Sequence, residues 1–330
     1  MKSYYEIYTA KNTIRELVYY VMLNGQLVED FSFYNGKSGI ALSLFEASRF
    51  LNDQTIEDYA YDLLSQSLLF QSTDISLETG LAGIGFVLEY LIQNKFIESN
   101  PKEIFNEQHE KIVHTFLQYD VIKMNIDNLA SIWPIASYLY VSGENRTKKQ
   151  ISSIKEMEMK NLYYLWKKAK SNSENKEYLT EILRGFLKNA LFRSEIIPNV
   201  FFQQYTSLVK EGIFRRDVHI QFYMSSIKHS ATNLFDNELH MMLKQLSLVD
   251  RIDTKCLFKE PYLSQHNVRD YLCKKFFASR PQDLDEILSV IVMGKGNPTR
   301  LSFGLAGLIL GLIAIHQGNH QRLHNILSII

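Results

Sequence analysis

Apolar residues recur along this chain at the three- and four-residue spacing of helices. The run GIALSLFEASRFL at residues 39–51 is so rich in them that it indicates a helix buried on most sides. Other runs are amphipathic, with a polar face opposite an apolar stripe: TIEDYAYDLLSQSLLF (55–70), NEQHEKIVHTFLQY (106–119) and KNLYYLWKKAK (160–170). The alternation predicts pairs of helices, each with an amphipathic outer member and a buried inner member.

A short glycine phrase precedes three of the inner helices: YNGKSG (34–39), ETGLAG (78–83) and SFGLAG (302–307). Each copy has two glycines three residues apart. Gly36 and Gly80 are 44 residues apart (80 minus 36), a length that two helices and two loops fill. Glycine can take positive φ just before a helix and lets backbones approach closely, so we expect it to shape these turns.

Weaker copies of the same unit lie in the middle of the chain. In DNLASIWPIASYLY (127–140), Ser131 and Pro134 stand where the glycines would be. Further candidates are LRGFLKNALF (183–192), SSIKHSATNLF (225–235) and CLFKEPYLSQ (256–265). We therefore predict one all-α domain over residues 1–330, with six to seven inner/outer helix pairs. Closing the pairs into a ring, an α/α toroid, removes the exposed ends that an open solenoid must cap.

Composition narrows the possible partners and compartment. The 36 basic and 36 acidic residues balance, so nothing points to nucleic acid. Cys256 and Cys273 are too few for a disulfide framework, which favours a reduced, cytoplasmic setting. The longest apolar stretch, residues 301–315, is shorter than the roughly 20 residues that a bilayer needs. We expect a cytoplasmic protein without a membrane span.

The phrases NGKSGIALSL, ETGLAGIGFVLEYL and SFGLAGLILGL resemble the repeats of the lanthionine synthetase C-like family, the lanthipeptide cyclases. The resemblance implies an α/α toroid of seven inner and seven outer helices. It also implies a reaction in which a peptide cysteine adds to dehydroalanine or dehydrobutyrine. In that family a zinc ion lowers the pKa of the thiol, and its ligands lie in the phrases WCYG.PG and CHG.AG.

The ligand positions are altered in this chain. Ser302 and Phe303 stand at the cysteine and histidine of the second phrase, and neither side chain suits zinc. Cys256, in KCLFKEP, is a weak counterpart of the first phrase, whose glycine is missing. The alternative for Cys256 is a small buried apolar residue. We therefore expect no metal and no other cofactor, unless a cyclase site of another form holds zinc.

The resemblance further implies an acid and a histidine for proton transfer. Asp127 in DNLASIWPI corresponds to the acid, and a helix N-cap is its alternative role. His229 in SIKHSATNL corresponds to the histidine, but Arg184 in LRGFLKN fits that position as well. The residues leave this choice open.

These observations favour a protein of ribosomal peptide maturation that lacks the zinc site. It would be a divergent cyclase or a peptide-binding accessory protein, with a precursor peptide and its modifying enzymes as partners. The alternative is a carbohydrate-active α/α toroid, such as a glycosidase or a sugar epimerase, with aromatic platforms near the inner-helix starts. The candidate platforms are Tyr34, Trp133, Tyr138 and Phe303. No paired carboxylates stand at the repeat starts, which ranks this alternative second.

Overall fold

The computed structural model describes most of the first half of the chain and a segment near its end. These residues are 4–120, 123, 126–154, 156–157, 180, 183–184, 187, 197–198, 210, 220, 229–230, 299–301 and 304–317. The helices are α1 (Tyr4–Gly25), α2 (Lys37–Leu51), α3 (Gln54–Leu68), α4 (Leu81–Gln93), α5 (Pro101–Ile104), α6 (Asn106–Leu117), α7 (Ile126–Val141) and α15 (Leu305–Gln317). Two short strands, β1 (Ile197–Pro198) and β2 (His229–Ser230), pair in parallel.

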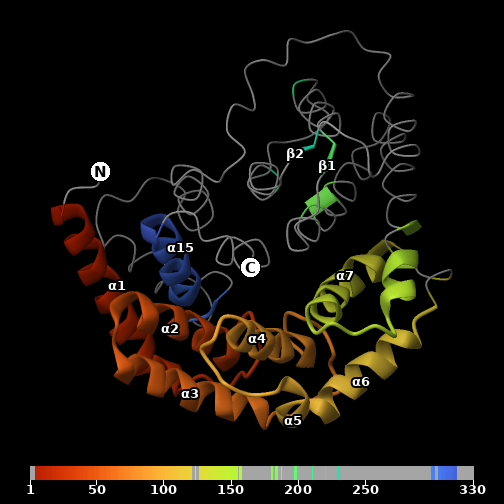
Figure 1. Ribbon diagram of the computed structural model, residues 1–330, viewed down its shortest axis with the longest axis horizontal. Coiled ribbons are helices and arrows are strands. Elements are labelled where there is room, and N and C mark those ends of the chain that lie inside the picture. Colours follow the sequence, from red (N-terminus) through yellow and green to blue (C-terminus); the bar gives the residue numbers. More distant parts are fainter. Residues whose placement is uncertain are drawn as a thin grey trace.

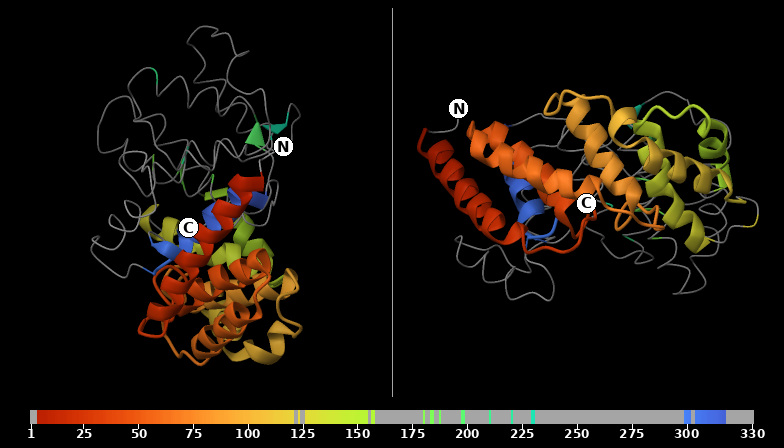
Figure 2. Two further views of the ribbon diagram at one scale, coloured as in Figure 1. Left: turned by 90° about the vertical axis from the view of Figure 1, so that its left-hand side faces the viewer. Right: turned by 90° about the horizontal axis from the view of Figure 1, so that it is seen from below.

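The helices form two layers that follow an arc (Figure 1). The inner layer runs α15, α2, α4 and α7, with each member packed on the next, and α3 and α6 cover α2 and α4 from outside. Seen from below, the outer helices lie side by side (Figure 2). The predicted alternation of inner and outer helices is thereby confirmed, and with it the all-α toroid class.

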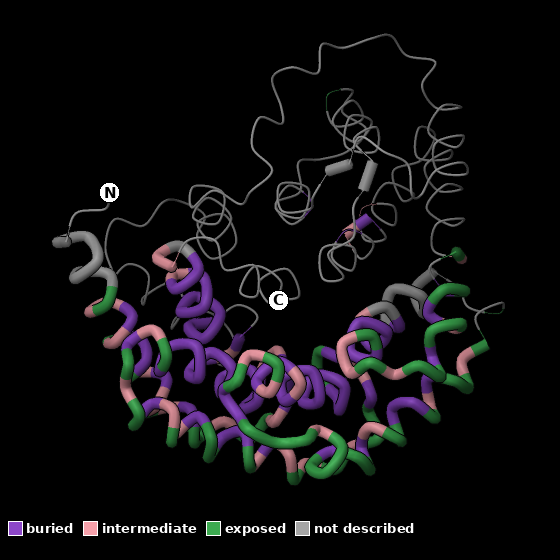
Figure 3. Tube along the Cα trace, viewed as in Figure 1, coloured by how far each residue is buried: buried purple, intermediate pink, exposed green. Residues whose placement is uncertain are grey.

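Burial follows the two layers. The inner helices are buried almost throughout, whereas the outer arc alternates between buried and exposed positions (Figure 3). In α3 the buried positions include Ile56, Ala60 and Leu63, which recur at helical spacing. Asp53 begins this helix by accepting a hydrogen bond from the Thr55 N–H at 3.0 Å. The amphipathic pattern of residues 55–70 is thus the pattern of an outer helix.

The first glycine of each phrase is required by close approach rather than by its backbone angles. Gly36 and Gly80 are N-caps with φ of −119° and −114°, so the expected positive φ is absent at both. A Cβ at Gly36 would lie 2.5 Å from the carbonyl oxygen of Asp30, and one at Gly80 would lie 2.5 Å from that of Asp74. The loop backbone therefore leaves no room for a side chain.

The loops before α2 and α4 share one hydrogen-bonding scheme. In both, an aspartate accepts from the N–H two residues later through its carboxylate, and from the first residue of the inner helix through its carbonyl. The bonds are Ser32 N to Asp30 Oδ1 (2.7 Å), Lys37 N to Asp30 O (2.8 Å), Ser76 N to Asp74 Oδ1 (2.8 Å) and Leu81 N to Asp74 O (3.0 Å). This scheme sets where each inner helix begins.

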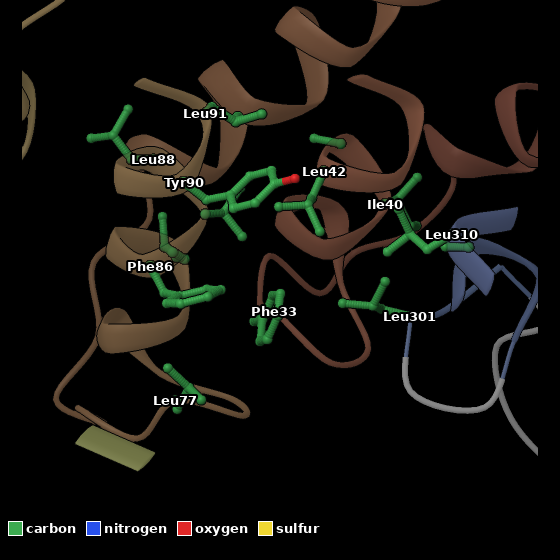
Figure 4. Close-up of a cluster of buried hydrophobic side chains, with 14 of the residues drawn as sticks. Phe33, Ile40, Leu42, Leu77, Phe86, Leu88, Tyr90, Leu91, Leu301 and Leu310 are labelled. Atoms are coloured by element: carbon green, nitrogen blue, oxygen red, sulfur yellow. The ribbon is translucent and has the colours of Figure 1, made fainter. Parts of the chain in front are cut away.

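The second glycine of each phrase receives a side chain from the preceding repeat. A Cβ at Gly39 would come within 3.0 Å of the Leu301 Cβ, and one at Gly83 within 2.6 Å of the Phe33 Cβ. Leu301 and Phe33 both stand three residues before a first glycine. In Figure 4, Phe33 lies between Leu301 and Phe86, and its ring centroid is 5.5 Å from that of Phe86. Successive repeats therefore interlock at the second glycine.

The last repeat and the first repeat meet in the same way as neighbours in sequence. The Leu301 N–H donates to the Tyr34 carbonyl at 3.0 Å, and the Tyr34 N–H donates to the Glu78 carbonyl at 3.0 Å. In addition, α15 packs on both α1 and α2. Contact between segments from opposite ends of the chain indicates a closed ring rather than an open solenoid.

The third repeat differs from its predicted register. Helix α7 begins at Ile126, 45 residues after Leu81 (126 minus 81), so it keeps the period of the first two repeats. Ser131 and Pro134 consequently lie inside α7, and their placement at the glycine positions is wrong. Proline is common in the first turn of a helix, which made it resemble a start signal, but here it is tolerated in the interior.

The central repeats fall mostly outside the described residues. Leu183, Arg184 and Leu187 are helical, as predicted for 183–192. His229 and Ser230, within the candidate unit at 225–235, are extended, and the other residues of that unit lie outside the described part of the chain. The extent of the single domain, 1–330, stays a prediction. None of the helices that the structure describes has the length and apolar character needed to span a membrane.

The interlock predicts a large stability loss for Gly83→Ala. The new Cβ would overlap the Leu77 carbonyl oxygen and press on Phe33, and backbone cannot yield as a flexible side chain can. We expect the free energy of unfolding to fall by about 3 kcal/mol, measured by urea denaturation. Gly25→Ala is the matched control, because its Cβ would meet side chains alone, the nearest being the Tyr59 hydroxyl at 3.1 Å. Equal stability of the two variants would contradict the close approach at the second glycine.

Candidate functional site

The glycine phrases gather on one face of the ring. Residues 26–36 and 69–80 each join the end of an outer helix to the start of an inner helix, and residues 299–301 lead towards α15. The hydrogen bonds from Leu301 to Tyr34 and from Tyr34 to Glu78 join these three segments side by side. We call the surface formed by the three segments the glycine face.

Two positions in each described phrase combine a fixed backbone with a side chain that is at least partly exposed. They directly precede the first glycine and are Tyr34 and Asn35 in one repeat, and Glu78 and Thr79 in the next. Glu78 and Thr79 are exposed, while Tyr34 and Asn35 are half-buried. By the resemblance, these positions correspond to the two ligands of CHG.AG. The arrangement can therefore present side chains to a ligand at the face.

The glycine face is acidic in the described segments. Residues 26–36, 69–80 and 299–301 contain four carboxylates and one basic side chain, Arg300. Burial raises the pKa of Asp74, but hydrogen bonds from the Ser76 N–H and from the Thr79 and Ser76 hydroxyls outweigh it and leave the pKa below its usual value. Asp74 is thus ionised at neutral pH.

The predicted proton-transfer residues are positioned only in part. Asp127 is the second residue of α7, inside the first turn and not at the N-cap. His229 lies in β2, where its Cα is paired with that of Ile197. Arg184 is helical and half-buried. The side chains of Asp127 and His229 lie outside the described part, so their role in proton transfer, and the choice between His229 and Arg184, stay predictions.

The residues at the ligand positions do not fit zinc. Phe303 has no donor atom, and a serine hydroxyl such as that of Ser302 is a poor ligand. The equivalent positions in the described repeats hold tyrosine, asparagine, glutamate and threonine, and not the thiolates and imidazoles that zinc prefers. Within the described residues, no three His, Cys, Asp or Glu side chains converge as a metal site would require. Cys256, Ser302 and Phe303 themselves lie outside those residues.

A second polar cluster, missed at the level of sequence, lies at the opposite face, where α6 begins and α7 ends. His109 Nδ1 lies 2.8 Å from the Tyr138 hydroxyl, and Nε2 lies 3.2 Å from Glu144 Oε2. Arg146 bridges Glu144 Oε1 at 3.1 Å and Glu110 Oε1 at 3.0 Å. The five residues come from α6, α7 and the segment after α7, and no spacing in the sequence indicates that they meet.

The electrostatics of this cluster suit a structural role. Hydrogen bonds from Arg146, followed by one from His109, hold the pKa of Glu144 at about 2 despite partial burial. Burial strongly raises the pKa of Tyr138, which is only 2% exposed. A substrate cannot reach a hydroxyl buried to this degree. The cluster therefore fixes α6 against α7.

The position of Tyr138 differs from the one expected in the carbohydrate-active alternative. There its ring was expected close to an inner-helix start, as a platform on which a sugar could stack. Instead it lies near the end of α7 and covers Gly85 of α4, where a Cβ would come within 2.7 Å of the ring. The side chain of Trp133 and the whole of Phe303 lie outside the described residues. Tyr34 is the one described candidate at the glycine face.

Comparison with known proteins gives one match. Residues 28–190, about half of the chain, match the family model described as Lanthionine synthetase C-like protein. The searches of curated proteins and of solved structures found no match. The matched range contains residues 28–36 of the loop before α2, the whole loop before α4, and all of α7.

Glu89 on α4 provides a test of the electrostatics between α4 and its neighbours. Burial raises the pKa of Glu89 to about 6, partly offset by a hydrogen bond from Gln93 and by the charge of Lys102. The ordinary value of this pKa is 4.5, so the folded state binds this proton more tightly. The contribution of Glu89 to the free energy of unfolding is therefore largest below about pH 4.5 and is lost as the pH rises through about 6.

We expect Glu89→Gln to raise the free energy of unfolding at pH 7.5 by about 1 kcal/mol, a value reduced for partial solvent screening. The variant should also lack the part of the fall in the free energy of unfolding between about pH 4.5 and 6 that Glu89 causes. Urea unfolding at a series of pH values measures both effects. Glu107→Gln, at an exposed position of α6, should leave the profile unchanged. A decline that persists in Glu89→Gln would show that another group causes it.

Proposed function

Because this chain belongs to the lanthionine synthetase C-like family, we propose that it binds a ribosomally made precursor peptide at the glycine face. In this proposal it acts in peptide maturation without the family's zinc site. Its role is that of a peptide-binding accessory protein or of a divergent cyclase that uses other groups.

One observation carries the proposal: the chain keeps the loops of the repeat and changes the side chains that they present. The first glycines and the aspartate-centred hydrogen bonds recur in the loops before α2 and α4. The side chains just before the first glycine differ in every copy, from Tyr34-Asn35 to Glu78-Thr79 and Ser302-Phe303. Retained architecture with altered ligand chemistry supports binding more than zinc-dependent catalysis.

The glycine face offers suitable contacts for a peptide. Glu78 and Thr79 are exposed and can accept hydrogen bonds from peptide N–H groups or from basic side chains. The half-buried Tyr34 adds an aromatic surface beside them. The excess of carboxylates favours peptides with lysine or arginine.

The chemistry of the family is addition of a peptide cysteine thiolate to a dehydro amino acid. Bound zinc would lower the pKa of the cysteine thiol so that the thiolate forms. Ser302 and Phe303 do not provide the donors for this role. The proposal therefore contains no zinc-dependent step. Asp127 and His229 remain candidates for proton transfer in the divergent-cyclase form.

The test uses a labelled synthetic peptide with one cysteine, one dehydroalanine and two lysines. We expect the purified protein to bind it in fluorescence anisotropy. Alkylation and mass spectrometry then follow the free thiol: loss at the uncatalysed rate identifies an accessory protein, and faster loss without zinc identifies a divergent cyclase. Zinc content is measured in parallel, beside Cys256→Ala. About one zinc per chain, lost in that variant together with thiol consumption, would contradict the proposal and establish a zinc-dependent cyclase.

Glu78→Gln tests the location of the binding site. The substitution keeps the shape of the side chain and removes its charge at the glycine face. We expect the dissociation constant for the same peptide to rise about three- to tenfold, corresponding to about 1 kcal/mol for a partly exposed charge. Glu107→Gln, at the opposite face, should bind as the unmodified chain does. Equal binding by both variants would exclude the glycine face as the site.

A further inference from the structure

The three most exposed large hydrophobic side chains of the described residues lie at the ends of the outer helices α1 and α3. Leu23 and Leu27, at the end of α1 and just beyond it, are each 78% exposed, and Leu69, directly after α3, is 80% exposed. Leu117 ends α6 and is 41% exposed. Each of these ends leads into a loop that precedes an inner helix. The leucines therefore lie along the outer edge of the glycine face.

Contacts between neighbouring repeats make this edge continuous. Gln66 on α3 donates to Gln26 just after α1 at 3.2 Å. The rings of Phe31 and Phe70, one from each loop, have centroids 5.3 Å apart. Lys111 on α6 donates to the Ser72 carbonyl at 2.6 Å, which ties α6 to the loop before α4. Three successive outer-helix ends are thus held together.

Carboxylates accompany the leucines in the same loops. Glu29, Asp30, Asp74 and Glu78 are all exposed. In the part of the chain that the structure describes, none of the four forms an ion pair. Two lysine amines lie at the same edge: that of Lys37 is 2.6 Å from Gln66 Oε1, and that of Lys111 is 2.6 Å from the Ser72 carbonyl. Four carboxylates against two ammonium groups leave the edge with exposed leucine and an excess of negative charge.

We propose that Leu23, Leu27, Leu69 and Leu117, with the four carboxylates, form a docking ledge for a basic, amphipathic segment of the bound peptide. This inference rests on the proposed peptide-binding function and adds a second contact region at the outer edge of the glycine face. Leucines of the segment cover the exposed leucines, and its lysines or arginines face the carboxylates. Such a segment tethers the peptide and raises its effective concentration at the glycine face.

The charges favour this occupant over two others. A bilayer with anionic lipids is repelled by four carboxylates, although leucines alone would suit it. A second copy of the chain, related by a two-fold axis, would bring the same carboxylates against one another. A basic peptide segment satisfies both the apolar and the acidic parts of the ledge.

The experiment uses the full chain and a labelled amphipathic peptide of about 14 leucines and lysines, without cysteine or dehydroalanine. Anisotropy measures binding to the unmodified protein, to Leu27→Ser/Leu69→Ser and to Ile104→Ser. Ile104 is the control at the opposite face, where it is 39% exposed. Leu27 and Leu69 are 78% and 80% exposed, so the double variant should keep its circular dichroism and melting temperature, whereas Ile104→Ser should keep the fold with a slightly lower melting temperature.

We expect the double variant to weaken binding at least tenfold and Ile104→Ser to leave it unchanged. Peptides with serine for leucine, or glutamate for lysine, should bind tenfold more weakly or worse. Equal binding by the double variant would overturn the ledge. Binding to vesicles of phosphatidylglycerol in place of the peptide would overturn it too, as would a dimer in sedimentation that the double variant abolishes.

The outcomes separate the ledge from the proposed function. If the protein binds the cysteine and dehydroalanine peptide but not the leucine and lysine peptide, the ledge is wrong and the proposed function stands. If Leu27→Ser/Leu69→Ser weakens the second peptide while Glu78→Gln has no effect on the first, the ledge is supported and the binding site assigned to the glycine face is wrong.

Discussion

The close approach of loop backbone to the start of each inner helix is the constraint on which the rest of this structure depends. At Gly36 and Gly80 the carbonyl of an aspartate occupies the space of a Cβ, and at Gly39 and Gly83 the carbonyls of Phe33 and Leu77 do so, with a side chain from the preceding repeat close beside them. Because protein interiors are close-packed, these contacts fix both the tilt of each inner helix and its distance from its neighbour. The spacing of the whole arc follows from them.

The same constraint explains how the fold can be kept while the chemistry changes. The glycines and the aspartate carbonyls hold the backbone, so the two residues just before the first glycine can vary in type. In the described repeats these positions hold Tyr34, Asn35, Glu78 and Thr79, four different residue types on one backbone scheme. Function in such a ring resides in side chains that vary while the backbone scheme is kept.

Much of the fold could be predicted because its signals are local. Helical periodicity and the 44-residue spacing gave α2, α3, α4, α6 and α15 within a few residues. The third repeat was misplaced because Pro134 resembled a start signal, and the loop glycines were expected at positive φ although they serve close approach. The cluster of His109, Tyr138 and Glu144 could not be predicted, since its members meet only through the packing of α6 on α7.

Ring closure has a consequence for how this protein is made. The hydrogen bond between Leu301 and Tyr34 joins residues 267 positions apart in sequence (301 minus 34). Contacts of such separation form late, because the chain entropy of closing the loop must be lost before they contribute. During synthesis the Gly39 side of α2 waits for a partner that lies 262 residues further along the chain (301 minus 39). The nascent ring therefore has one apolar helix face open until that partner emerges, and this face is exposed to misassembly for that time.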